Sequence, residues 1–249
     1  MAKKRPVTTK KKTLEPQQER SRESLQKLLR ATIEVLGQHG VEGATIPRIA
    51  RHAGLTPGSV YRRFHDKEAL LETAILGILE RQNENLRTMT PEMVREIPLR
   101  VFADQIINGF VVGYRARAPL IRAMRQFVQS RTGSPFYKKA TRLEIKTYER
   151  LIELFMMHND RINHPDPAIA ISTGLMMVVS TVYELVVLPP DLTAWKGLLP
   201  NDDPALKREL VRAFLTYLGV KELSGEAGKM EAEQMAAAKR WRERTSQNV

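Results

Sequence analysis

Residues 45–71 read TIPRIARHAGLTPGSVYRRFHDKEALL, and this stretch decides the fold of the chain. It predicts a helix from about Ile46 to Ala53, with Thr45 as the N-cap and Pro47 near the first helical position, where its missing N–H costs little. Gly54 follows, and glycine readily adopts the positive φ that stops a helix in a sharp turn. The stretch therefore begins with a short helix that ends abruptly.

A second short helix follows the turn, with Thr56 as its predicted N-cap and Pro57 at its first position. The two helices are expected to pack through apolar side chains at Ile49, Ala50, Ala53, Leu55, Val60 and Phe64. The outer face of the second helix carries Thr56, Pro57, Gly58, Ser59, Tyr61, Arg62 and Arg63. Small polar groups, an aromatic hydroxyl and two guanidinium groups suit base edges and phosphates. The pattern predicts a helix-turn-helix whose second helix enters the DNA major groove.

Further residues extend this pattern on both sides of the helix-turn-helix. The full set is Ala31, Leu36, Gly40, Thr45, Ile49, Ala50, Ala53, Gly54, Leu55, Tyr61, Phe64 and Lys67–Leu71. With this spacing, residues from Arg22 to Gln82, about a quarter of the chain, resemble the DNA-binding domain of the TetR family of transcriptional regulators. The resemblance implies an all-α fold, in which an N-terminal three-helix domain precedes a helical domain for ligand binding and dimerisation. It also implies a homodimer that binds double-stranded DNA and responds to a small-molecule effector.

The resemblance assigns DNA contacts to particular residues of the matching segment. Tyr61 is expected to reach a phosphate through its hydroxyl, and Lys67 through its ammonium group at a helix N-terminus. Further phosphate contacts are expected from Thr45 and Ser59, and helix geometry, not the resemblance, assigns Arg48 and Arg63 to phosphates as well. Base reading is expected of Thr56, Pro57, Gly58 and Arg62. The alternatives are a purely structural role for Tyr61 and helix capping alone for Thr45 and Thr56.

The charge of the chain is concentrated near this motif. Of the formal net charge of +12, residues 1–67 carry +9, since they hold 15 lysines and arginines but only 6 acidic residues. Such a distribution is typical of a nucleic-acid binder, although a solvated basic tail gives the same count. The chain has no cysteine, which excludes disulfides and thiolate metal sites and favours a reducing, cytoplasmic location. No apolar segment precedes Leu25, so we expect no secretory signal.

Catalytic patterns are missing from the sequence, so we expect no enzyme and no cofactor. There is no phosphate-binding loop, dinucleotide-binding glycine pattern or Gly-x-Ser-x-Gly elbow. One turn gathers metal-ligand types at His158, Asp160, His164 and Asp166. Their spacing matches no standard ligand pattern and is ordinary turn chemistry, so we expect no metal site there.

Four segments are predicted along the chain. Residues 1–18 form a disordered basic arm, which either contacts DNA or serves only as a solubilising terminus. Residues 19–87 form the DNA-binding domain, with helices at 19–38 and from Asp66 to Arg87. Residues 88–222 form the effector-binding and dimerisation domain, with helices at roughly 91–116, 119–131, 135–158, 167–188 and 203–219. Residues 223–249 form a charged helix or tail.

The most apolar segment, 168–188, is long enough to span a bilayer. Its polar residues, especially Glu184, and the prolines that follow favour a packed helix in a core or dimer interface over a membrane span. In the family that the chain resembles, two late helices form a four-helix bundle between subunits. A stripe that faces the core gives the same pattern.

Effector-pocket candidates are aromatic, methionine and other apolar side chains of the helical domain, together with one carboxylate. They are Phe102, Ile106, Phe110, Tyr114, Phe127, Tyr148, Met176, Tyr183 and Glu184, with Met124, Phe155 and Met177 as further candidates. The apolar ones equally suit an ordinary core. Glu184 requires a partner among its apolar neighbours, either an arginine (Arg115, Arg117 or Arg122) or a polar ligand.

Together these observations predict a sequence-specific, dimeric transcriptional regulator, a repressor that leaves its operator when an effector binds. The alternative is an architectural or scaffolding protein that binds DNA with low sequence selectivity. The ratio of specific to nonspecific affinity at fixed salt separates the two.

Overall fold

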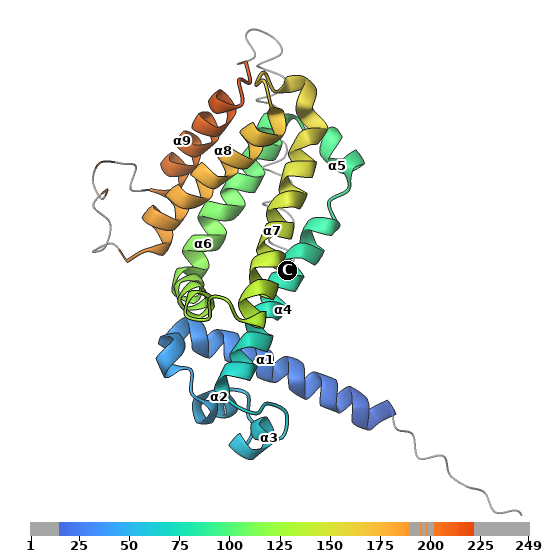
Figure 1. Ribbon diagram of the computed structural model, residues 1–249, viewed down its shortest axis with the longest axis vertical. Coiled ribbons are helices and arrows are strands. Elements are labelled where there is room, and N and C mark those ends of the chain that lie inside the picture. The colour runs from blue at the N-terminus through green and yellow to red at the C-terminus, as the bar shows by residue number, and fades with distance from the viewer. Residues whose placement is uncertain (1–14, 190–194, 196–197, 199–201, 222–249) are drawn as a thin grey trace, which may run out of the picture. The chain divides into compact units, whose positions relative to one another are not determined.

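The computed structural model describes residues 15–189, 195, 198 and 202–221, with side chains from residue 21 onward (Figure 1). The chain divides between Ala74 and Ile75 into two compact units. All secondary structure in the described residues is helical, which confirms the predicted all-α class. The predicted C-terminal segment at 223–249 and most of the predicted basic arm lie outside the described residues.

The first unit contains helices α1 (Glu15–Gly43), α2 (Ile46–His52), α3 (Pro57–Tyr61) and the start of α4 (Lys67–Arg87). Helix α1 begins four residues earlier than predicted and is interrupted at Gly40, where φ is 65°. The residues after that interruption, up to Gly43, return to helical geometry, so the predicted end near Gln38 marks the kink. The core of this unit consists of Leu28, Ala31, Thr32, Val35, Leu36, Ala44, Ile46, Ile49, Ala50, Ala53, Val60, Leu70, Leu71 and Ala74.

The turn between α2 and α3 follows the local sequence signals closely. Gly54 adopts a φ of +64°, as its position after α2 predicted. Thr56 caps α3, because its hydroxyl accepts a hydrogen bond from the Ser59 amide at 3.2 Å. Asp66 caps α4 by accepting from the Ala69 amide at 2.7 Å. These three signals fix the helix-turn-helix between residues 46 and 66.

The second unit contains the rest of α4 and the helices that follow it. These are α5 (Pro91–Arg95), α6 (Leu99–Gln129), α7 (Pro135–Phe155), the 3₁₀ helix η1 (Met156–Arg161), α8 (Pro167–Val182), the π-helix η2 (Tyr183–Val187) and α9 (Asp203–Tyr217). Helices α6, α7, α8 and α9 lie lengthwise beside one another (Figure 1).

Within the segment 91–131, the helices break at a different place from the one predicted. The predicted helix break before Pro119 is wrong, because α6 continues through this proline. Arg117 absorbs the distortion with φ −126° and ψ 18°, so the helix bends without ending. The true interruption lies earlier, at residues 96–98, where Pro98 precedes the first turn of α6.

Three phenylalanines form the centre of the second unit. Phe155 of α7 lies 4.7 Å from Phe102 of α6 and 5.2 Å from Phe214 of α9, measured between ring centroids. All three are fully or almost fully buried. Gly174 brings α8 against this cluster, since a Cβ atom there would lie 2.7 Å from a ring carbon of Phe214.

Helix α8 with η2 (Pro167–Val187) is long and apolar enough to cross a membrane by length and composition alone. Its buried side packs against α6, α7 and α9 within the second unit. This packing accounts for much of the apolar character that the sequence shows at 168–188.

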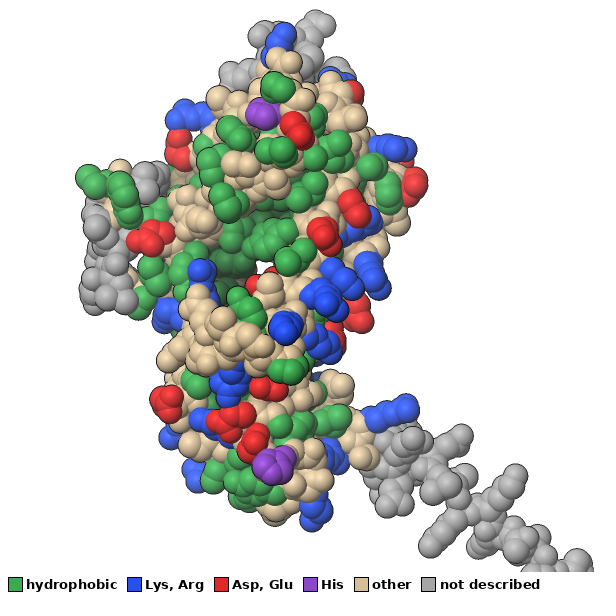
Figure 2. Space-filling model, in the orientation of Figure 1, with side chains coloured by type: hydrophobic (Ala, Val, Ile, Leu, Met, Phe, Trp, Pro, Cys, Tyr) green, Lys and Arg blue, Asp and Glu red, His purple; other side chains and the backbone are tan. Residues whose placement is uncertain are grey.

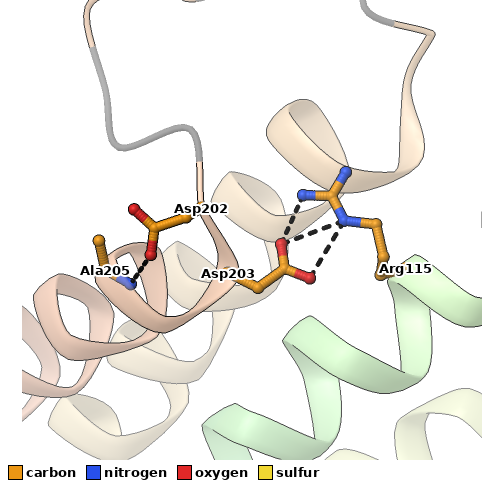
Figure 3. Close-up of polar contacts among 4 residues, drawn as sticks. All are labelled: Arg115, Asp202, Asp203 and Ala205. Atoms are coloured by element: carbon orange, nitrogen blue, oxygen red, sulfur yellow. Dashed lines mark hydrogen bonds and ion pairs between the residues drawn. The ribbon is translucent and has the colours of Figure 1, made fainter.

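An ion pair joins α6 to the first turn of α9 (Figure 3). The Arg115 guanidinium donates to both carboxylate oxygens of Asp203, with a shortest distance of 2.6 Å. The neighbouring Asp202 caps α9 by accepting from the Ala205 amide at 2.7 Å. The start of α9 is therefore held by two adjacent carboxylates with different partners.

Candidate DNA interface and effector cavity

Helix α3 turns one residue inward and several outward. Val60 is completely buried in the core of the first unit. Because successive residues are 100° apart around a helix, Gly58 and Arg62 lie on the opposite, exposed side. A Cβ atom at Gly58 would meet no heavy atom within 4 Å, so the backbone there is open to an approaching surface. Pro57 is also exposed.

A small polar network connects the exposed side chains of α3. The hydroxyls of Thr56 and Ser59 lie 2.9 Å apart, and the Arg62 guanidinium donates to the Ser59 hydroxyl at 3.1 Å. Three of the predicted base-contacting or phosphate-contacting residues thus lie together. In this arrangement Arg62 rests along the helix surface.

Tyr61 and Thr45 present unpaired hydroxyl groups within the described part of the chain. Tyr61 is 56% exposed, which contradicts a buried structural role for its ring. Thr45 occupies the N-cap position of α2, but its side chain makes no capping hydrogen bond. The predicted N-cap position of Thr45 is therefore confirmed, and its exposed hydroxyl is available to another partner.

Three predicted phosphate-contacting cations contact their own chain. The Arg48 guanidinium donates to the Gly43 carbonyl at 2.8 Å, and the Lys67 ammonium donates to the Val41 carbonyl at 3.3 Å. Arg63 donates to the Ser21 hydroxyl at 3.3 Å. Arg48 and Lys67 therefore approach the same short stretch at the end of α1.

The predicted effector residues are dispersed in the second unit. Phe102 and Phe155 belong to the buried core, and Phe127 is buried against Phe136 at a ring distance of 5.6 Å. Four candidates are partly buried and pack against the core: Ile106, Phe110, Tyr114 and Tyr148. Met124, Tyr183 and Glu184 are also partly buried, whereas Met176 and Met177 are largely exposed.

A cavity of about 220 Å³ lies between α7 and α8, and Figure 2 shows an apolar hollow on this face of the helical unit. It is lined by Tyr148, Ile152, Ser172, Leu175, Met176, Val179 and Ser180. Of the predicted candidates, it contains only Tyr148 and Met176. The sequence did not predict the other five, because an aliphatic or serine residue in a helix does not by itself distinguish a cavity wall from an ordinary core.

A polar cluster adjoins the cavity at Tyr148. Tyr114 and Tyr148 lie close enough for each to influence the other, and burial raises the pKa of both phenols. Burial also raises the pKa of Glu144, while the positive charge of Arg125 opposes this rise. The Arg125 guanidinium stacks over the Tyr183 ring, 4.1 Å from its centroid. This cluster of tyrosines with one cation and one carboxylate joins α6, α7 and η2.

Glu184 does not bind the arginines that the sequence offered as partners. Arg115 pairs with Asp203, and Arg122 donates to the backbone carbonyl of Val187. Neither these two nor Arg117 forms an ion pair with Glu184 in the described residues. The structural pairing predicted for this carboxylate is therefore wrong, because the arginines have partners elsewhere or remain exposed.

The fold and the exposed α3 define a helix-turn-helix DNA-binding protein. Residues 28–74 match the profile of the family described as bacterial regulatory proteins, tetR family. This chain therefore carries a DNA-binding domain of the TetR family, and it resembles the transcriptional regulators of that family. It is a DNA-binding transcriptional regulator and not an enzyme.

Relatives and solved structures extend the similarity beyond the DNA-binding segment. The HTH-type transcriptional regulator BetI of Vibrio atlanticus is 28% identical over 167 residues, which cover 66% of this chain and 80% of that protein. A TetR-family regulator from Mesorhizobium loti superposes with a TM-score of 0.56 at 20% identity, covering 79% of this chain and 97% of the other. FadR of Bacillus subtilis, in complex with stearoyl-CoA, superposes with a TM-score of 0.54 at 16% identity and covers 77% of this chain and 98% of its own.

These similarities favour the regulator over the architectural alternative. The two structures, at such low identity, show only that the covered 77–79% of this chain shares their fold. TetR-family regulators bind DNA, often dimerise and often bind small-molecule effectors.

Proposed function

We propose that the chain is a cytoplasmic repressor, which binds an inverted repeat as a homodimer and leaves it when a small molecule occupies the helical unit. The exposed face of α3 is the observation that carries this proposal. It combines an open backbone at Gly58 with a positioned Arg62, and its reverse side is anchored by fully buried Val60. A helix supported in this way suits insertion into the major groove.

Base and phosphate contacts divide between the two sides of this face. Arg62 lies opposite buried Val60, so we assign base reading to it together with Thr56, Pro57 and Gly58. Phosphate contacts fall to hydroxyls and cations at the edges of the face: Thr45, Arg48, Ser59, Tyr61, Arg63 and Lys67. Arg48 and Lys67 then have a dual role, since they also hold the end of α1.

Dimerisation is assigned to the outer side of α8 and the end of α9. Ile169 is 58% exposed, Met176 62%, Met177 42% and Tyr217 37%. Apolar side chains gathered on one exposed surface indicate an interaction site. A second copy of the chain accounts for this surface, because a palindromic operator requires a two-fold symmetric protein.

The effector is assigned to the cavity between α7 and α8. The stearoyl-CoA complex of Bacillus subtilis FadR supports ligand binding in a fold of this kind. Helix α7 is also tied to the C-terminal half of α4. Asn83 donates to the Leu143 carbonyl at 3.0 Å, and Lys139 pairs with Glu80 at 2.9 Å. A ligand that shifts α7 therefore acts directly on α4, the helix that continues into the DNA-binding unit.

Selection of bound sites from random duplex DNA, with the full chain at near-physiological salt, tests the proposal. Recovery of an inverted repeat supports dimeric, sequence-specific recognition and supplies the operator. Binding without any shared motif contradicts it and returns the architectural alternative. Placing the recovered operator upstream of a reporter then distinguishes repression from activation.

Replacing Tyr61 by Phe removes only the exposed hydroxyl. We expect affinity to fall by about three- to tenfold on the operator and by a similar factor on unrelated duplexes, because a phosphate contact carries no sequence information. Fluorescence anisotropy with labelled duplexes measures both affinities. Tyr137→Phe, on α7, is the matched control and should bind as the unaltered chain does. Unchanged affinity of the Tyr61 variant contradicts the phosphate role.

A further inference from the structure

We propose that Ser59 positions Arg62 to read a guanine in each half of the operator. The inference rests on the proposed function, since it requires a DNA site that is recognised by its sequence. It goes further in naming the base and the residue that orients its reader. In this role Ser59 acts through Arg62, in addition to the phosphate contact assigned to its hydroxyl.

The Arg62 side chain lies back along α3, toward the beginning of the helix. Arg62 is the C-cap residue of α3, about one turn beyond Ser59. Its guanidinium nevertheless donates through Nη2 to the Ser59 hydroxyl at 3.1 Å. In helix-turn-helix proteins the N-terminal residues of the recognition helix contact the base edges. The bond to Ser59 therefore brings the guanidinium toward the part of α3 that contacts bases.

The Ser59 hydroxyl is itself held from the other side by Thr56. The two hydroxyl oxygens lie 2.9 Å apart, and the Thr56 oxygen also accepts from the Ser59 amide at 3.2 Å. Thr56 is the N-cap residue of α3, so the first turn of the helix fixes its side chain. The contacts from Thr56 through Ser59 restrain Arg62, a side chain that otherwise adopts many rotamers. Less conformational entropy is then lost when Arg62 contacts a base.

The neighbouring arginine is held in a different direction. Arg63 lies just after α3, and its guanidinium donates to the Ser21 hydroxyl of α1 at 3.3 Å. Of these two arginines, Arg62 is the one that lies along the exposed side of α3, on which Gly58 leaves the backbone open. The contacts of the two side chains therefore assign base reading to Arg62.

The exposed side of α3 offers the DNA mainly hydrogen-bond donors. Residues 56–63 contain no Asn, Gln, Asp or Glu, the side chains that pair with adenine or accept from cytosine. A guanidinium only donates, and it has more N–H groups than the bond to Ser59 uses. Guanine presents the acceptors O6 and N7 side by side in the major groove, and an arginine can bind both at once. Guanine is therefore the base that matches Arg62 best.

Replacing single atoms of the DNA tests the guanine contact with the unaltered chain. Site selection supplies the operator, and each guanine of a half-site is then replaced in turn by 7-deazaguanine, which pairs normally but lacks the N7 acceptor. We expect a position at which this replacement lowers affinity about three- to tenfold, measured by fluorescence anisotropy. Arg62→Ala should lose less than about twofold at the same position, because its methyl group donates no hydrogen bond.

Ser59→Ala tests the positioning role. Loss of a phosphate contact lowers the affinity for all duplexes by the same factor, whereas loss of positioning acts on the operator alone. We therefore expect operator affinity to fall at least about threefold more than affinity for unrelated duplexes. Ser59→Thr, which keeps the hydroxyl, should restore the ratio of the two affinities. Thermal unfolding verifies that the variants remain folded.

Ser21→Ala is the matched control, since it removes the hydroxyl partner of Arg63. It should leave the ratio of operator affinity to unrelated affinity unchanged.

Equal losses on the operator and on unrelated duplexes for Ser59→Ala overturn the positioning role, because they correspond to a phosphate contact alone. An operator that tolerates 7-deazaguanine at every guanine, or has no guanine in its half-sites, overturns the base assignment and leaves the proposed repressor intact. Site selection that recovers no shared motif overturns the proposed function and this inference together.

Discussion

Individual glycines in the first unit have different physical roles. Gly54 adopts positive φ, which other residues reach only with strain, so it is required by the backbone of the turn. Gly58 has ordinary helical geometry and empty space where a side chain would stand. The fold therefore does not require a glycine at residue 58, whereas the close approach to DNA proposed for this residue would require one.

Replacing Gly58 by Ala separates these two requirements. We expect the free energy of unfolding to stay constant or rise by up to about 1 kcal/mol, because alanine restricts the unfolded chain. Operator affinity should fall on the order of tenfold, because the added methyl group stands between the backbone and the groove. Urea unfolding and fluorescence anisotropy measure the two quantities.

Gly54→Ala is the matched control for that substitution. It should destabilise the chain by about 1–2 kcal/mol, since alanine is strained at positive φ. The folded variant should keep most of its operator affinity. Full operator affinity of the Gly58 variant contradicts the assigned groove contact.

His158 is a buried imidazole whose charged form is disfavoured. Burial lowers its pKa, with a further contribution from Arg161, whereas Asp160 and a hydrogen bond to the Val94 backbone oppose the shift. Its Nε2 atom has no hydrogen-bond partner in the described structure. His158 belongs to η1, which packs against α5, and its neutral ring lies next to Phe102.

The pH dependence of stability follows from this shift. The unfolded chain takes up a proton at the ordinary histidine pKa of about 6.5, whereas the folded chain resists it until lower pH. The stabilising contribution of neutral His158 to folding is thus present above a pH of about 6.5 and is lost as the pH falls below that value. Thermal unfolding between pH 7.5 and pH 5.5 should show a steeper loss for the unaltered chain than for His158→Gln. Parallel profiles contradict this account.

At the scale of secondary structure, local signals predicted the helix-turn-helix better than the helices of the second unit. Gly54, Thr56, Pro57 and Asp66 each act within one turn of backbone, so their consequences are visible in the sequence. Pro119 was misleading, because its effect depends on whether tertiary packing holds the helix together on both sides.

The two carboxylates at the start of α9 provide a test at the same scale. Asp202→Ala should lower the free energy of unfolding by about 1 kcal/mol, which is the usual effect of removing an N-cap side chain. Asp203→Asn should cost less, roughly 0.2–1 kcal/mol, since the pair with Arg115 is partly exposed and screened. Urea unfolding measures which of the two variants loses more free energy of unfolding. A larger loss for Asp203→Asn shows that the ion pair dominates and contradicts this ranking.

At the scale of the whole molecule, the sequence indicated the class of function but not the ligand site. The residues to which we assign DNA contact, Thr45 to Lys67, span 23 positions and carry a family pattern. The cavity instead combines Tyr148 and Ile152 of α7 with residues of α8. Which of many aromatic and aliphatic residues meet there depends on helix rotation and packing, which periodicity alone does not fix.

The proposed dimer surface gives a prediction at this scale. Ile169→Glu should place a charge in the subunit contact and convert the protein to monomers. Operator affinity should then fall by at least 100-fold, because two recognition helices no longer bind together. Ile145→Glu on α7, where the residue is 51% exposed, is the matched control and should remain dimeric. Light scattering after size-exclusion chromatography measures the mass. A dimeric Ile169 variant places the contact elsewhere.

Met176 belongs to two surfaces at once, because it lines the cavity and is also 62% exposed on the outer side of α8. If that outer side joins two subunits, the same thioether touches both the bound ligand and the neighbouring chain. Ligand affinity and the dimer dissociation constant are then linked by reciprocity. Dilution alone should change the apparent ligand affinity, so the response of the cell to a given ligand level depends on how much of this regulator it makes.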